Sequence, residues 1–304
     1  MSDNEEQFEL INKQPNIQGD KLVKEAKKRL QSISLFNPNK YEEAIELFEK
    51  AAAQYKSTKN WNEAGEVYVI CAEICEKRNN QSDACNYYTS AGKMYRHYDI
   101  SNAVKMFLIS GQMHQEDNRF SAAAKLYKDI GNCYERLLNT KDAIIIYSKA
   151  ADLYEAEDAT SNANQCRQKV SELYVENGEY QKALELYEKI SKSSLESNVG
   201  KWTAKDYFYK ALMCKFVLLA RSNQVELLQE KIENYKDLLP SLDGSRECKF
   251  IEDILQSYID DDIEKFSDIV FKYNEIYKID DFTTKMLYEI KQLLRNNEEE
   301  QDLT

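Results

Sequence analysis

The chain has 304 residues, with 41 basic and 53 acidic side chains, and a formal net charge of −12. This acidity argues against nucleic acid as a partner, because phosphate binding draws on a positive field. Three prolines and eight glycines are too few for a turn-rich β architecture, so we expect an almost entirely helical chain. No apolar run approaches the ~20 residues that span a bilayer, and the acidic N-terminal sequence is unlike a signal peptide. We therefore expect a cytoplasmic protein.

The first segment, residues 1–39, begins with a polar arm. Asp20 can cap a basic helix that ends before Pro38. A short loop follows this helix and carries three bulky apolar side chains, Ile33, Leu35 and Phe36.

Residues 40–200 form a repeat. Alanines recur every twenty residues, with one step of nineteen, at Ala44, Ala64, Ala84, Ala103, Ala123, Ala143, Ala163 and Ala183. Four positions after each alanine stands an aromatic residue, except at Arg167, and eight positions after each stands a small one. Offsets of four and eight share one face of a helix, where small residues let helices approach and rings fill the space between them. The pattern predicts antiparallel hairpins of about forty residues, stacked as a tetratricopeptide-like α-solenoid with an extended binding surface.

The alanine register fades after Ser191, although helical periodicity continues. We expect residues 201–295 to form a C-terminal helical bundle. Residues 296–304 carry four acids and one apolar residue, which predicts a flexible acidic tail.

Features that would identify an enzyme are absent from the sequence. No glycine precedes Lys-Ser or Lys-Thr, and there is no Gly-x-Gly, so a phosphate-binding loop is not expected. The seven cysteines show no paired spacing and there are only two histidines, so we expect reduced core thiols and no metal site. We predict a protein without catalytic activity or cofactor.

Basic residues cluster in the first helix and in the middle repeats. Lys105 and Lys125 each lie two residues after a register alanine. This equivalence suggests a row of lysines across successive helices, although exposed lysines are also common on any solvated helix face.

Seven stretches of the chain resemble one family, and several of them lie outside the repeat pattern. They are Tyr41–Phe48, Lys59–Gly65, Ala159–Cys166, Thr203–Ala211, Asp243–Lys249, Asp281–Leu287 and the closing acidic run. In these stretches the chain resembles the soluble NSF attachment proteins of the alpha type, adaptors that bring the hexameric ATPase NSF to SNARE complexes.

The resemblance implies that several copies grip the acidic four-helix SNARE bundle through a basic concave face. Positions that match the family's basic contacts are Lys59, Arg96, His97, Arg119, Lys125, Lys169, Lys201 and Lys205. The family commonly has a lysine where this chain has Gln165.

The resemblance also assigns roles to the two ends. Ile33, Leu35 and Phe36 correspond to a loop that attaches the protein peripherally to an anionic membrane on its cytosolic face, although the loop here is shorter. The ATPase contacts implied at the other end are Asp260, Asp261, Asp262, Glu298, Glu299, Glu300, Asp302 and Leu303. Together these features predict an adaptor for SNARE disassembly in vesicle fusion.

Two alternatives stay open from the residues. A general tetratricopeptide scaffold for another helical or peptide partner would need neither chain terminus. A lipid-surface factor would depend mainly on the first helix and its loop.

Overall fold

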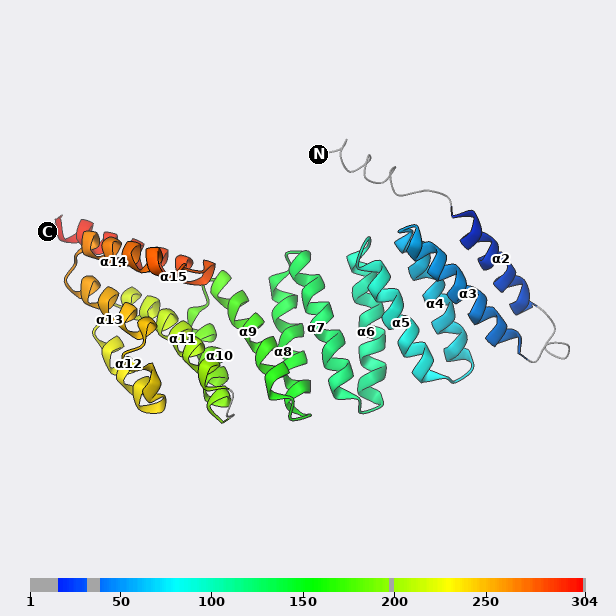
Figure 1. The fold of residues 1–304 in the computed structure, drawn as a ribbon, viewed down its shortest axis with the longest axis horizontal. Helices are drawn as coiled ribbons and strands as arrows, with labels where there is room; N and C mark the ends of the chain where they lie inside the picture. Colours follow the sequence, from blue (N-terminus) through cyan, green and yellow to red (C-terminus); the bar gives the residue numbers. More distant parts are fainter. Residues whose placement is uncertain (1–15, 32–38, 197–199, 303–304) are drawn as a thin grey trace, which may run out of the picture. The chain divides into compact units, whose positions relative to one another are not determined.

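The computed structural model describes residues 16–31, 39–196 and 200–302, with the backbone alone described at 201–202 and 297–302. All regular structure in these ranges is helical, and successive helices form antiparallel hairpins (Figure 1). The predicted fold class, an all-α protein of stacked helical hairpins, is confirmed. The chain divides into two compact units, Met1–Ala159 and Thr160–Thr304.

The first unit is a stack in which each helix packs on the next. Its described helices are α2 (Ile17–Gln31), α3 (Lys40–Ser57), α4 (Trp61–Lys77), α5 (Gln81–Tyr95), α6 (Ile100–Glu116), α7 (Phe120–Arg136) and α8 (Thr140–Glu155). Because the helices alternate in direction, their turns lie along two opposite edges (Figure 1). We call the edge with the turns at 58–60, 96–99 and 137–139 the first edge. The turns at 78–80 and 117–119 lie on the second edge.

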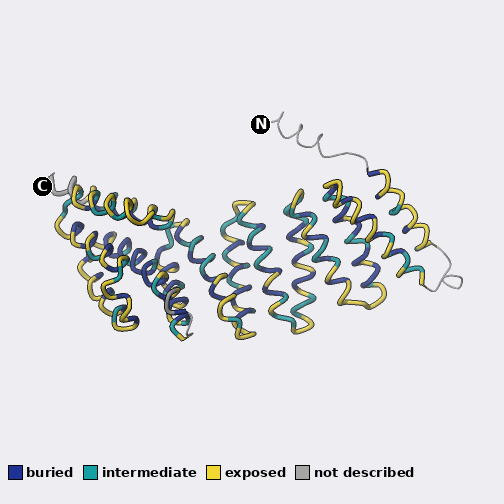
Figure 2. Tube along the Cα trace, viewed as in Figure 1, coloured by how far each residue is buried: buried dark blue, intermediate teal, exposed yellow. Residues whose placement is uncertain are grey.

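The repeat register predicted from the sequence sets the helix packing. All eight register alanines are completely buried, and six of the seven aromatic residues are buried as well. A methyl group added at Gly92 would lie 2.6 Å from the ring of Phe107, and one at Gly131 would lie 2.6 Å from that of Tyr147. The small residue of one helix therefore receives the ring of the next, and burial follows this stripe along each helix (Figure 2).

The same contact corrects the predicted row of lysines. The ring-on-glycine relation runs from α5 to α6, and from α7 to α8, and Gly111 of α6 meets Tyr127 of α7 in the same way. Each helix is related to the next by the same contact but runs in the opposite direction. Such a relation is a half-turn about the stacking direction combined with a shift along it. The half-turn exchanges the two faces of the stack. By this argument Lys105 on α6 and Lys125 on α7 belong to opposite faces, which speaks against the suggested row of lysines. Equivalent positions return to one face only every second helix.

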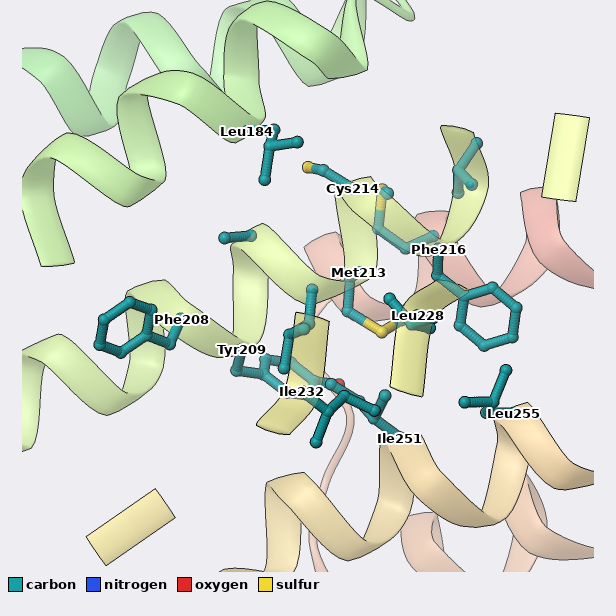
Figure 3. Packing of buried hydrophobic residues seen from close by; sticks show 14 of the residues in the cluster. Leu184, Phe208, Tyr209, Met213, Cys214, Phe216, Leu228, Ile232, Ile251 and Leu255 are labelled. Atoms are coloured by element: carbon teal, nitrogen blue, oxygen red, sulfur yellow. The ribbon is translucent and has the colours of Figure 1, made fainter. Parts of the chain in front are cut away.

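The second unit surrounds one long apolar helix. Its described elements are α9 (Thr160–Glu176), α10 (Tyr180–Leu195), α11 (Lys201–Arg221), α12 (Leu227–Leu238), a short 3-10 turn η1 (Pro240–Leu242), α13 (Arg246–Ile259), α14 (Ile263–Ile276) and α15 (Asp281–Asp302). Helix α11 contacts α10, α12, α13 and α15. Figure 3 shows Met213 and Phe216 of α11 among side chains of α12 and α13, and Phe208 belongs to the same core cluster. Most residues of α11 between Ala204 and Ala220 are buried, as expected of a helix at the centre of such a bundle.

The division between the units differs from the boundary predicted at residue 200. Tyr187 of α10 packs against Tyr207 of α11 and Phe282 of α15, with ring centroids 6.2 and 5.9 Å apart. Helix α10 therefore shares the core of the C-terminal bundle.

The predicted flexible tail also differs from the structure, because α15 continues to Asp302. Glutamate and glutamine are good helix formers, which explains why the acidic sequence extends the helix. The predicted membrane-loop residues Ile33, Leu35 and Phe36 lie outside the described residues, as does Leu303. Among the helices that the structure describes, none combines the length and apolar character needed to cross a membrane.

Candidate protein-binding surface

A basic band follows one side of α7. Lys125, Asp129, Asn132 and Arg136 are spaced by four, three and four residues, so they lie on one stripe of the helix. Lys125 is exposed. Arg96, which follows α5, reaches Asp129 at 3.3 Å, and the Arg136 guanidinium donates to the Arg96 carbonyl oxygen at 2.8 Å. We call Arg96, Lys125 and Arg136 the basic band.

Two more predicted contacts lie beside this band on the first edge. The rings of His97 and Trp61 stack at 4.3 Å with an interplanar angle of 20°. This stack joins the turn that carries His97 to the turn that carries Lys59, whose side chain is exposed. The structure thus places Lys59, Arg96 and His97 on one edge, although they lie in two different turns.

Arg119 occupies the other end of α7. It is the residue before the helix, on the second edge, and its guanidinium pairs with Asp117 at 2.7 Å. Seventeen residues of helix span about 25 Å. The predicted contacts of the first unit therefore form an extended surface rather than a pocket, as suits an elongated partner. Exposed ion pairs such as Arg119–Asp117 contribute at most about 1 kcal/mol, so a partner can displace them.

The predicted contacts in the second unit have different surroundings. Lys169 on α9 lies 3.8 Å from Glu172. Lys205 on α11 pairs with Glu247 of α13 at 3.0 Å, and only 24% and 14% of these side chains are exposed. Lys201 is the first residue of α11, and its side chain is outside the described set.

Glu247 is held by two cations. Burial raises the pKa of this carboxyl, but hydrogen bonds from Arg246 and Lys205 more than offset that effect and leave the pKa below its usual range. Lys205 therefore joins α11 to α13, so much of its charge is already compensated within the unit.

The three aspartates predicted to face the ATPase form the turn between α13 and α14. Asp260 pairs with Lys265 at 2.7 Å, and hydrogen bonds from Lys265 and Gln256 lower the pKa of its carboxyl. Asp262 caps α14 by accepting the Lys265 amide proton at 2.8 Å. Asp261 has a φ of 56°, in the left-handed region that aspartate tolerates. All three thus have local structural roles.

The other predicted ATPase contacts on described backbone lie on the last turns of α15; they are Glu298, Glu299, Glu300 and Asp302.

Sequence reasoning missed two residues of the surface. Arg136 was not singled out, although its position eleven residues after Lys125 is a helical spacing that could have indicated it. Trp61 lies in the stretch Lys59–Gly65, but its stacking on His97 could not be predicted from that stretch, because it depends on contact between two turns.

All seven cysteines are buried, and none takes part in a disulfide bond. Burial raises the pKa of Cys214 to about 12 and that of Cys248 to about 11, which keeps both thiols protonated. Protonated buried thiols pack as small apolar side chains and are poor metal ligands.

A stack of helical hairpins that carries a basic band on an acidic chain defines a helical-repeat protein with an extended surface suited to binding other macromolecules. The comparisons with known proteins then identify the family. A family model described as soluble NSF attachment protein, SNAP, matches residues 17–295, so this chain belongs to that family. It is therefore an attachment protein and not an enzyme.

Curated relatives come from distant organisms. The chain is 32% identical to an alpha-soluble NSF attachment protein of Vitis vinifera, over 95% of this chain and 99% of the relative. It is 30% identical to the alpha-soluble NSF attachment protein of Mus musculus, over 92% of this chain and 95% of the relative. It is also 31% identical to a probable vesicular-fusion protein sec17 homolog of Schizosaccharomyces pombe, over 94% of this chain and 98% of the relative.

Proposed function

We propose that this chain binds assembled SNARE complexes and recruits the NSF ATPase, which then disassembles them after vesicle fusion. The names of its relatives, NSF attachment protein and vesicular-fusion protein, support this general role. The observation that carries the SNARE-binding surface is the basic band along α7, which stands out on a chain of net charge −12. An acidic helical bundle is the natural complement of such a band.

In this proposal, contacts at the two ends of the chain reinforce the basic band. Several copies surround one SNARE bundle on the cytosolic side of a membrane. The loop with Ile33, Leu35 and Phe36 rests on anionic lipid, and the acidic residues near the C-terminus meet the ATPase. Each contact is weak alone, but linked contacts raise the effective concentration for one another.

The test is reversal of charge at two basic residues of this surface, Arg119 just before α7 and Lys125 in its first half. We expect the double variant Arg119→Glu, Lys125→Glu to lose most binding to a recombinant SNARE bundle in a pull-down at moderate salt, because two attractive contacts become repulsive. Lys105→Glu is a control for charge reversal in general, since it makes one Lys→Glu change at the equivalent position of α6, outside the basic band, and should bind normally. Circular dichroism should show unchanged helicity in both variants. Normal binding by the double variant would contradict the assignment of this surface.

A further inference from the structure

One turn of the first unit breaks the pattern of the others. The described repeat turns hold one residue each at positive φ in six cases, and five of these are polar or glycine: Lys59, Asn79, Asn118, Asp158 and Gly178. The sixth is Leu138, with a φ of 55°. Leucine is disfavoured in this region, and 89% of Leu138 is exposed. Burial of the Leu138 side chain therefore contributes little to stability, and the backbone conformation at this position disfavours leucine. Such a combination is typical of a residue with a functional role.

Other exposed apolar residues lie next to Leu138. Leu137 is 44% exposed, and Tyr98 in the neighbouring turn of the first edge is 62% exposed. The hydrogen bond from Arg136 to the Arg96 carbonyl holds these two turns together. Three exposed apolar side chains therefore lie on the first edge, directly beside two residues of the basic band. We call Tyr98, Leu137 and Leu138 the apolar tip.

We infer that the apolar tip contacts the same partner as the basic band. The partner surface it fits is a protein helix that carries acidic side chains beside exposed apolar ones. Arg96 and Arg136 supply the charge complement, and the tip buries the apolar part of the partner. This inference rests on the proposed function, since it extends the same binding surface. It also predicts a salt-resistant component of binding, because salt screens exposed ion pairs but does not weaken apolar burial.

The decisive variant is Leu138→Asn, which installs the residue already present in the turns at Asn79 and Asn118. Asparagine tolerates positive φ, so the melting temperature should stay the same or rise. Binding to a recombinant SNARE bundle should nevertheless weaken, by roughly tenfold if most of the leucine side chain is buried in the complex. The loss should persist in high salt, where the wild-type chain keeps its apolar contact. Ile145→Gln is the control, because Ile145 is an exposed apolar residue within helix α8 and not in a turn of the first edge.

Three results would overturn the inference. If Leu138→Asn binds the bundle like the wild type at low and high salt, the tip has no part in this surface, while the proposed function still stands. If Leu138→Asn lowers binding to vesicles of mixed neutral and anionic lipid but not to the bundle, the tip serves a membrane. If it lowers self-association in sedimentation experiments but not bundle binding, the tip serves a second copy of this chain. Failure of the wild-type chain itself to bind the bundle would instead reject the proposed function and, with it, this extension.

Discussion

At the scale of single residues, the repeat depends on small side chains beneath large rings. Gly92 accepts the ring of Phe107, and Gly131 accepts that of Tyr147, each so closely that a methyl group would overlap the ring. In packing this close, the addition of a single carbon atom changes the distance between neighbouring helices. The repeat therefore tolerates variation on its exposed faces more readily than in these columns.

Two glycine substitutions test this packing. Gly92→Ala should destabilise the chain by about 1–3 kcal/mol, because the new methyl lies 2.6 Å from buried ring carbons. Gly111→Ala should be neutral or stabilising, since its nearest neighbour is 3.5 Å away and alanine favours a helix by about 1 kcal/mol over glycine. Chemical denaturation followed by circular dichroism measures both. Equal effects of the two substitutions would contradict the packing described for this column.

At the scale of helices, charged pairs join elements of the second unit. Lys205 and Glu247 connect α11 to α13, and Lys231 connects α12 to Glu188 of α10 at 2.6 Å. These pairs are partly buried, so removing one partner leaves a charge in a poorly solvated place. They join α10, α11, α12 and α13 to one another.

The depressed pKa of Glu247 gives this unit an acid-sensitive component. A carboxyl whose pKa is lower in the folded state stabilises the fold above its ordinary pKa of 4.5, and that stabilisation is lost as the pH falls through the folded value. Glu247→Gln should therefore lower stability at pH 7 by about 1–3 kcal/mol, and its difference from the wild type should shrink below pH 4.5.

Denaturation curves at pH 7 and at acid pH measure this difference. Glu179→Gln is the control, because it removes an exposed pair with Lys182 and should change little. A Glu247→Gln difference that stays constant with pH would show that the carboxylate charge is not the stabilising feature.

At the scale of the whole molecule, the proposed adaptor separates its two binding functions along the chain. The basic band lies in the first unit, and the acidic residues assigned to the ATPase lie near the C-terminus in the second. Leu303 is the one apolar residue among the last nine, which favours docking into a pocket of the ATPase.

Leu303→Ala should separate these functions. We expect normal binding to the SNARE bundle but weaker stimulation of ATP hydrolysis by NSF, because the apolar anchor is lost while the basic band is intact. A coupled ATPase assay and a pull-down on the same preparation measure both properties. Normal stimulation would remove the role assigned to Leu303, and loss of SNARE binding would argue against separate sites.

The sequence by itself determined the helical repeat and much of the candidate surface. The eight alanines and six of the seven rings are buried as the repeat pattern predicted, because a helix converts fixed spacing into a fixed face. Family resemblance supplied Lys59, Arg96, His97, Arg119 and Lys125, and the family itself is confirmed. Their contact with SNAREs stays a prediction.

Only the tertiary structure decided which of these residues share a surface. Spacing along one helix does not reveal that successive antiparallel helices exchange faces, which the glycine contacts of α5 to α8 indicate. The ion pair of Lys205 with Glu247 and the stacking of Trp61 on His97 join residues that are far apart in the sequence. Such contacts depend on how separate helices pack, and no pattern within a single helix contains that information.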